Sequence, residues 1–211
     1  MIAFRLYLIT DRRLFVDRDS LLNGVEDALR AGVKAVQLRE KDMSIKELLD
    51  TAYRMKGLTS GYGARLFVND RIDVALCTEA DGVHLGQTGI PVHAVRKMVG
   101  KKMLIGASTH NLTEALAAEK EGADFITFGP LYDTPSKRRF GKPLGLDVLK
   151  SVSEKLSVPV FGIGGIKQEN IRDVIRSGAY GIALIRGILG EVDVAVTARK
   201  YLGELELGEQ S

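Results

Sequence analysis

The sequence predicts an α/β fold, specifically a single-domain (β/α)8 barrel of the TIM type. Eight short apolar runs alternate with eight amphipathic patterns, and glycines close two consecutive runs near the C-terminal end. Strict alternation of this kind favours a parallel sheet, and eight units favour its closure into a barrel. An open doubly wound sheet is the structural alternative. The first strand–helix turn lacks the G-x-G-x-x-G of dinucleotide-binding sheets, which weakens that alternative.

Length and composition are those of one globular domain. The chain has 211 residues, near the lower size of such barrels, with 45% hydrophobic and 27% charged residues. The formal net charge of +3 is too small to indicate nucleic acid. Cys77 is the only cysteine, which excludes an intrachain disulfide and disfavours a cysteine-based zinc site. We assign residues 1–203 to the barrel and residues 204–211 to a polar tail that frays.

The N-terminal residues enter a strand pattern directly and lack the layout of a signal peptide. No apolar run reaches the length that spans a membrane. We therefore expect a cytoplasmic protein with no membrane or nucleic-acid partner. The sequence leaves open whether the chain forms a homo-oligomer.

The predicted strands are short apolar runs rich in β-branched residues, as expected for strands buried on both faces. They cover residues 4–9, 35–38, 65–68, 82–85, 103–106, 124–128 and 158–161, and the eighth begins at Gly181.

The predicted helices carry apolar residues at a spacing close to 3.6, with recognisable end signals. Ser20 and Ser44 are placed to cap helices, Pro91 suits a first helical position, and Gly32 and Gly122 suit helix ends. The expected helices begin near residues 21, 45, 72, 91, 113, 146, 167 and 189, and the last ends at Leu202.

Two glycine-bearing strand ends lie in consecutive units near the C-terminus. The first apolar run is followed by Gly162, Gly164 and Gly165, and the second runs from Gly181 to Gly187. Glycines between a strand and a helix let backbone N–H groups approach an anion, which the helix N-terminus also attracts. These loops therefore predict the phosphate site that many barrels form after strands 7 and 8. The alternative is that the glycines serve turns and close packing only.

Polar side chains follow the other predicted strands, where the active site of a barrel lies. Residues 37, 39 and 41 alternate, so an extended backbone would aim their side chains in one direction. The longest irregular segment, residues 129–145, is long enough to suggest a functional loop. The polar residues concerned are Gln37, Arg39, Lys41, Asn69, Asp70, Gln87, Ser108, His110, Thr134, Ser136 and Lys137.

Arginine and lysine suit phosphate oxygens, and the serine and threonine hydroxyls beside Lys137 suit a second anion. A lone carboxylate, Asp70, among these cations suggests Mg²⁺ that bridges to phosphates and keeps several waters. The alternative is a surface network in which Arg39 pairs with Glu40 and Lys41 pairs with Asp42.

These motifs, in this order, resemble those of thiamine-phosphate synthase and its relative, the TenI-type thiazole tautomerase. The resemblance covers nearly the whole chain. Its motifs are Gln37-Leu-Arg-Glu-Lys-Asp42, Val68-Asn-Asp70, Gly82-Val-His-Leu-Gly-Gln87, Ser108-Thr-His110, Gly129-Pro-Leu-Tyr-Asp-Thr-Pro-Ser-Lys137 and Gly162-Ile-Gly-Gly-Ile166.

The resemblance implies an enzyme of thiamine biosynthesis that joins hydroxymethylpyrimidine diphosphate to thiazole phosphate, releasing pyrophosphate. By analogy Gln37, Arg39, Lys41 and Asn69 would hold the pyrimidine diphosphate, and Asp70 would bind Mg²⁺. Ser108 and Lys137 would contact the diphosphate. The residues that would line the thiazole phosphate are Thr134, Ser136, Gly165, Ile185 and Arg186.

Two positions depart from the family pattern. A second Mg²⁺ carboxylate usually lies two residues after the Gly-Gln of strand 4, whereas Gly89 stands there. A serine is usual at Arg186, which could strengthen or occlude the last phosphate site. These departures leave open a metal-independent tautomerase with His110 as general acid/base, and a non-catalytic phosphate-binding barrel. The alternative for His110 is a loop histidine without a catalytic role, whose side chain is hydrogen-bonded to backbone.

Overall fold

The computed structural model describes residues 2–134 and 142–209. Eight parallel strands form a closed barrel in chain order, and β8 pairs with β1 to complete it. This arrangement confirms the predicted (β/α)8 fold. The strands are β1 Leu6–Ile9, β2 Ala35–Leu38, β3 Arg65–Asn69, β4 Gly82–Leu85, β5 Leu104–Thr109, β6 Phe125–Phe128, β7 Val160–Ile163 and β8 Gly181–Leu184.

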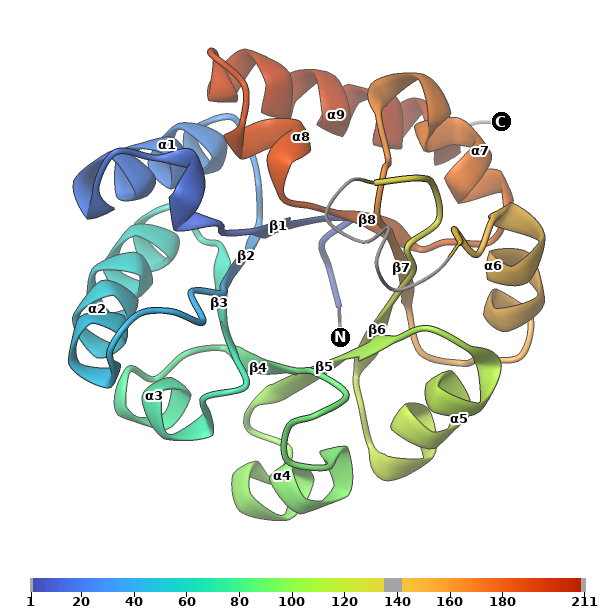
Figure 1. Ribbon diagram of the computed structural model, residues 1–211, viewed down its shortest axis with the longest axis horizontal. Helices are drawn as coiled ribbons and strands as arrows, with labels where there is room; N and C mark the ends of the chain where they lie inside the picture. The colour runs from blue at the N-terminus through green and yellow to red at the C-terminus, as the bar shows by residue number, and fades with distance from the viewer. Residues whose placement is uncertain (1, 135–141, 210–211) are drawn as a thin grey trace.

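The helices form a ring outside the barrel (Figure 1). Two short 3-10 helices, η1 Arg12–Leu14 and η3 Gln168–Asn170, follow β1 and β7. The α-helices are α1 Arg18–Arg30, α2 Ile45–Gly61, α3 Ile72–Cys77, α4 Val92–Val99, α5 Leu112–Glu121, α6 Leu146–Ser153, α7 Ile171–Arg176, α8 Arg186–Leu189 and α9 Val194–Glu209. Among the described residues, no helix has both the length and the apolar character needed to cross a membrane.

The hydrophobic core has two parts. The larger lies between the strands and the helix ring and includes Val25, Leu66, Val83 and Ile126. The smaller fills the barrel interior with aromatic rings. Phe4 lies at its centre, with ring centroids 5.3 to 5.8 Å from those of Tyr7, Phe67, Phe125 and Phe161. The barrel is therefore packed solid at this level and leaves only the strand ends for chemistry.

Two helix starts differ from the sequence-based expectation. Asp17, not Ser20, is the N-cap of α1, because Asp17 and Ser20 exchange the paired hydrogen bonds of a capping box in which Ser20 is the third helical residue. Pro91 precedes the first turn of α4 as its N-cap residue. The caps at Ser44 and the left-handed Gly122 are as predicted.

The C-terminal helix differs more. One helix over residues 189–202 is expected from the sequence, but α8 ends at Leu189 and α9 starts at Val194 and continues to Glu209. Leu205 is only 2% exposed and belongs to the larger core cluster. The assignment of residues 204–211 to a polar tail therefore needs correction up to Glu209, because Leu205 packs onto the barrel.

Candidate functional site

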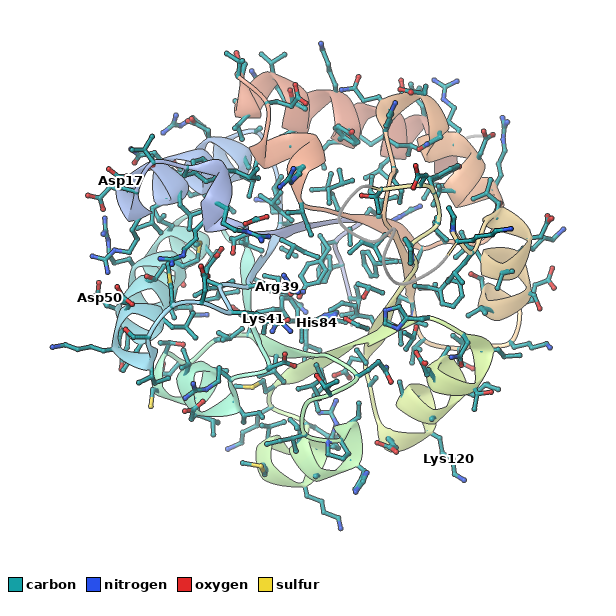
Figure 2. The ribbon with its side chains drawn as sticks, viewed as in Figure 1. Asp17, Arg39, Lys41, Asp50, His84 and Lys120 are labelled. Carbon is teal, nitrogen blue, oxygen red and sulfur yellow. The ribbon has the colours of Figure 1, made fainter. Side chains whose placement is uncertain are left out.

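The C-terminal ends of β2 to β5 bring the predicted polar residues into one connected cluster. Arg39, Lys41 and His84 lie near the barrel axis, whereas Asp17, Asp50 and Lys120 lie on the outer helices (Figure 2). Because the strands are parallel and the barrel is closed, the residues after each strand share one end of the molecule. We call this end the mouth.

Gln37 lies at the floor of the mouth. It is the third residue of β2, is 1% exposed, and donates from Nε2 to the Tyr7 hydroxyl at 3.2 Å. Burial raises the pKa of Tyr7 well above its ordinary value, so this hydroxyl stays protonated. The bond holds the Gln37 amide in one orientation beneath any ligand in the mouth.

The segment after β2 is tied to the loop after β1. The Arg39 N–H donates to Thr10 Oγ1 at 2.9 Å, and the Arg12 N–H donates to Glu40 Oε2 at 2.9 Å. Asp42 forms an ion pair with Arg12 at 2.9 Å rather than with Lys41. The surface pairing of Lys41 with Asp42 that the sequence left open is therefore not formed. Within the described residues, the Arg39 guanidinium has no ion-pair partner.

Asp70 collects contacts from three neighbouring segments. Its Oδ1 accepts the Gly86 N–H at 2.7 Å, and its Oδ2 accepts Asn69 Nδ2 at 2.8 Å and lies 3.6 Å from Lys41 Nζ. Asp70 also has a φ of +56°, a left-handed conformation that is uncommon outside glycine. Such strain often marks functional positions, and here it accompanies a carboxylate held between the Gly86 N–H and the Asn69 amide.

The residues around Asp70 fit Mg²⁺ with a single protein carboxylate. The described part of the chain contains no group of three or more His, Cys, Asp or Glu placed to hold a metal. A Cβ added at Gly89 would lie 3.0 Å from Asp70 Oδ1, so position 89 is where a second carboxylate would join. Mg²⁺ commonly binds through one or two carboxylates plus substrate phosphates and waters, which matches this donor set.

Ser108, near the end of β5, lies above a buried histidine. His84 is 2% exposed, and its Nε2 is 3.0 Å from Ser108 Oγ. Burial lowers the pKa of His84 to about 3, so the ring is neutral near pH 7. Gln87, after β4, donates from Nε2 to the carbonyl oxygen of Ser108. The ends of β4 and β5 are thus joined at the predicted ligand contact.

The other side of the mouth is made by backbone. The Leu131 N–H donates to the Ile163 carbonyl at 2.9 Å, and the Tyr132 N–H donates to the Gly164 carbonyl at 3.0 Å. Gly164 and Gly165 both have positive φ, and a Cβ at Gly165 would lie 2.7 Å from the Tyr132 Cβ. These glycines therefore serve close packing of the loops after β6 and β7, whether or not they also bind phosphate.

The remaining predicted residues lie on the same side or outside the described residues. Thr134 follows the packed segment after β6, and Ile185 and Arg186 come directly after β8, where Arg186 is exposed. Ser136 and Lys137 lie outside the described residues, so their predicted roles stay predictions.

His110, the candidate acid/base of the tautomerase alternative, lies at the edge of the mouth. Its side chain is 44% exposed and its Nδ1 is 3.2 Å from Glu114 Oε2. The same carboxylate oxygen accepts the His110 N–H at 2.8 Å. Glu114 on α5 therefore holds this histidine from the helix side.

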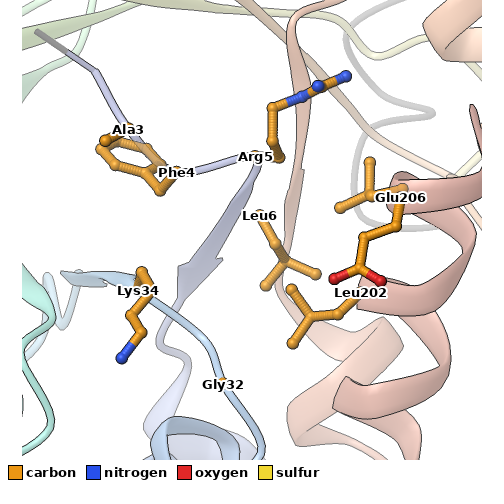
Figure 3. A pocket seen from close by; sticks show the side chains of 9 residues that line it. Ala3, Phe4, Arg5, Leu6, Gly32, Lys34, Leu202 and Glu206 are labelled. Carbon is orange, nitrogen blue, oxygen red and sulfur yellow. The ribbon is translucent and has the colours of Figure 1, made fainter. Parts of the chain in front are cut away.

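The opposite end of the barrel contains a pocket of about 180 Å³ that plays no part in this site. It lies between the start of β1, the segment before β2 and the last turns of α9 (Figure 3). Phe4, Arg5, Lys34 and Glu206 are among its lining residues. It is separated from the mouth by the aromatic interior of the barrel.

A sequence model of the thiamine monophosphate synthase family matches residues 6–188 of this chain, which include all eight strands. The chain belongs to the thiamine monophosphate synthase family. A relative from Geobacter sulfurreducens is 49% identical over 204 residues, covering 97% of this chain and 95% of that protein. The thiamine-phosphate synthase of Shouchella clausii is 42% identical over 210 residues and covers all of both chains.

Comparison with solved structures agrees with the family assignment. The structure of a thiamine phosphate pyrophosphorylase from Pyrococcus furiosus superposes with a TM-score of 0.88 at 36% identity, covering 97% of this chain and 96% of that one. The family resemblance stated from the motifs is thereby confirmed, as is its extent over nearly the whole chain.

Sequence reasoning missed the residues that support the site in this family member. Thr10 and Glu40 bind backbone of neighbouring loops. Glu40 lies inside the motif Gln37–Asp42, but its residue type there does not indicate this supporting role. His84 has a sequence signal of its own, because it is a polar residue inside an otherwise apolar four-residue strand. In a barrel such a residue faces inward, close to the strand end where ligands bind.

Proposed function

We propose that this chain is a thiamine-phosphate synthase. It joins hydroxymethylpyrimidine diphosphate to thiazole phosphate: the bond between the pyrimidine methylene carbon and the diphosphate oxygen breaks, and a bond from that carbon to the thiazole nitrogen forms. The products are thiamine phosphate and pyrophosphate. The reaction class is inferred from the family model and the relatives, and the arrangement of the mouth agrees with it.

The observation that carries the substrate assignment is the charge arrangement at the ends of β2 and β3. The Arg39 guanidinium has no ion-pair partner among the described residues, and Lys41 reaches Asp70 only at 3.6 Å. A diphosphate placed here meets an arginine that no described carboxylate neutralises, beside a lysine whose ion pair with Asp70 is long. Because negative charge builds on the diphosphate as it departs, these cations bind the transition state more tightly than the bound substrate.

Asp70 would hold Mg²⁺ with Asn69 beside it and with the diphosphate oxygens and water as further ligands. When bound, the metal supplies positive charge to the leaving diphosphate. Gln37 orients the pyrimidine from the floor of the mouth, and Ser108 donates to the diphosphate from the end of β5. The partners of this chain are thus small phosphorylated pyrimidine and thiazole compounds.

Arg186 and the loops after β6, β7 and β8 receive the thiazole phosphate. Gly165, Ile185 and Thr134 line this side, with Ser136 and Lys137 supplied by residues outside the described part. An arginine in place of the usual serine adds a charged donor fork for that phosphate.

The deciding experiment measures thiamine phosphate formed from both purified substrates, with and without Mg²⁺. We expect Mg²⁺-dependent product from the wild type. Absence of thiamine phosphate at every Mg²⁺ concentration, together with metal-independent thiazole tautomerisation lost in His110→Ala, would replace the synthase by the isomerase. A protein that binds pyrophosphate but catalyses neither reaction would indicate a non-catalytic barrel.

A further inference from the structure

A buried histidine lies directly beneath a predicted substrate contact. His84 lies in the middle of β4, opposite Gly106 of β5, and its Nε2 is 3.0 Å from Ser108 Oγ and 3.4 Å from Thr127 Oγ1. Its ring packs between Tyr7 and Phe125, with centroids 5.6 and 5.8 Å away. The imidazole is therefore held in one position by neighbours on three other strands, β1, β5 and β6.

Gly106 makes this position available. A Cβ at residue 106 would lie 2.5 Å from His84 Nδ1 and 2.5 Å from the nearest carbon of Phe125, closer than such atoms pack. The Nδ1 side of the ring thus faces the bare backbone of β5. Nδ1 is buried and has no hydrogen-bond partner among the described residues.

This asymmetry selects one tautomer. A neutral imidazole carries one proton, on either Nδ1 or Nε2, and a charged one carries both. A proton on Nδ1 would leave a buried N–H without an acceptor, which native structures rarely tolerate. A proton on Nε2 donates to Ser108 Oγ and leaves only a bare lone pair on Nδ1.

The tautomer in turn sets the direction of the Ser108 hydroxyl. If Ser108 Oγ accepts from His84, its own hydrogen is free to point into the mouth and donate to an anion. If Ser108 instead donated to His84, the serine would present lone pairs to the anion, which is repulsive. A hydrogen bond to a charged acceptor is about twice as strong as a neutral one, so the direction matters.

We propose that His84 is a positioning residue, which donates from Nε2 to Ser108 Oγ and so turns the Ser108 hydroxyl hydrogen toward the diphosphate. The inference deepens the proposed function and rests on it for the identity of the anion. It assigns no contact between His84 and substrate. Its prediction about the proton position holds in the free protein.

The first test is ¹⁵N NMR of protein labelled at its three histidines, His84, His93 and His110. His84→Gln removes one set of signals and thereby assigns it. We expect the His84 proton on Nε2 near pH 7, with Nδ1 unprotonated. A proton on Nδ1, or a charged ring, would overturn the inference without reference to any activity.

The second test measures the binding of inorganic pyrophosphate in the presence of Mg²⁺, alongside kcat and KM. His84→Leu removes the donor and should weaken pyrophosphate binding about tenfold, the cost of one such bond. His84→Gln, whose amide nitrogen reaches the place of Nε2, should stay within about threefold of wild type. Far-UV circular dichroism and thermal melting establish that both variants are folded.

A double-mutant cycle separates positioning from general support of the fold. In a Ser108→Ala background, His84→Leu should cost little further affinity, because the hydroxyl it orients is gone. An equal loss in both backgrounds would show that His84 acts only through structure. Since tautomer and pyrophosphate affinity need no turnover, an inactive wild type would count against the synthase while these readouts still decide the inference.

Discussion

Arg39 combines a fixed backbone with a side chain that forms no ion pair in the described part of the chain. Its N–H is bonded to Thr10 Oγ1, while its guanidinium has no ion-pair partner within residues 2–134 and 142–209. A cation held this way can meet a departing anion without first breaking a pair. This is the preorganisation that makes electrostatic catalysis effective.

Arg39→Ala should therefore lower kcat/KM for thiamine phosphate formation by about 10²-fold or more, equivalent to roughly 3 kcal/mol. Arg39→Lys is the matched control, and we expect it to recover only part of the loss because it keeps the charge without the planar fork. Thermal melting should change little in either variant. A large loss of stability in Arg39→Ala would instead make Arg39 a structural residue.

Gly89 occupies the position from which a second carboxylate would reach the predicted metal site. Its Cβ position is 3.0 Å from Asp70 Oδ1, so Gly89→Asp places a second carboxylate beside the first. The variant should lower the Mg²⁺ concentration for half-maximal rate, because two carboxylates attract the ion more strongly than one. Gly89→Asn has similar size without the charge and should not produce this shift.

Thr88→Asp is the companion variant. It tests whether the second carboxylate of the family corresponds to residue 88 instead of residue 89. Calorimetric titration of Mg²⁺ in the presence of pyrophosphate reports the same change without turnover. An unchanged Mg²⁺ requirement in both aspartate variants would argue against Asp70 as the metal ligand.

At the scale of elements, the loops after β1 and β2 hold each other. Glu40 is 6% exposed and accepts the Arg12 N–H, and Asp42 pairs with the Arg12 side chain. Burial raises the pKa of Glu40 above its ordinary value, partly opposed by its hydrogen bonds. Glu40 thus supports the segment that contains Arg39, but its charged form lowers the stability of the protein because it is buried.

Glu40→Gln should change how stability depends on pH. A raised pKa in the folded state means that Glu40 contributes fully below its unfolded pKa, and that this contribution falls as pH rises through the folded pKa. Glutamine keeps an oxygen for the Arg12 N–H but does not titrate, so the variant should lack this fall. Urea unfolding between about pH 4 and 7 measures it. Parallel curves for the two proteins would contradict the assignment.

The last turns of α9 are the second test at this scale. Leu205 is 2% exposed within the core, whereas Leu207 is 47% exposed. Leu205→Ala should lower the free energy of unfolding by about 2–5 kcal/mol, and Leu207→Ala by well under half of that. Denaturant unfolding compares the two. Equal and small effects would return this segment to the frayed tail expected from the sequence.

At the scale of the whole molecule, the two barrel ends have separate tasks. Phe4 precedes β1, is 4% exposed, and packs on four aromatic rings in the interior. Arg39, Asp70 and Ser108 are at the other end. Stability and chemistry are therefore carried by different layers of one barrel.

Phe4→Ala should cost about 3–5 kcal/mol of stability through the cavity it leaves. At a temperature where the variant is still folded, kcat/KM should stay near the wild-type value. Thermal melting and steady-state kinetics on the same preparation check both parts. A loss of activity in fully folded protein would mean that the interior transmits strain to the mouth.

The sequence by itself determined the fold class, the order of strands and the end of the barrel that carries the polar residues. Local patterns suffice for these, since strand alternation and glycine placement are properties of neighbouring residues. Positions at the ends of predicted strands are enough to place a set of polar residues in the mouth, namely residues 37, 39, 69, 70 and 108. Their catalytic roles, and those of Ser136 and Lys137, stay predictions.

Only the tertiary structure decided which residues become partners. Lys41 meets Asp70 rather than Asp42, His84 lies under Ser108 with Gly106 making room, and α9 continues to Glu209 because Leu205 finds a core to enter. Each outcome depends on strand register and barrel closure, which bring together residues far apart in sequence. A local pattern does not contain those distances, because they are set by packing across the whole barrel.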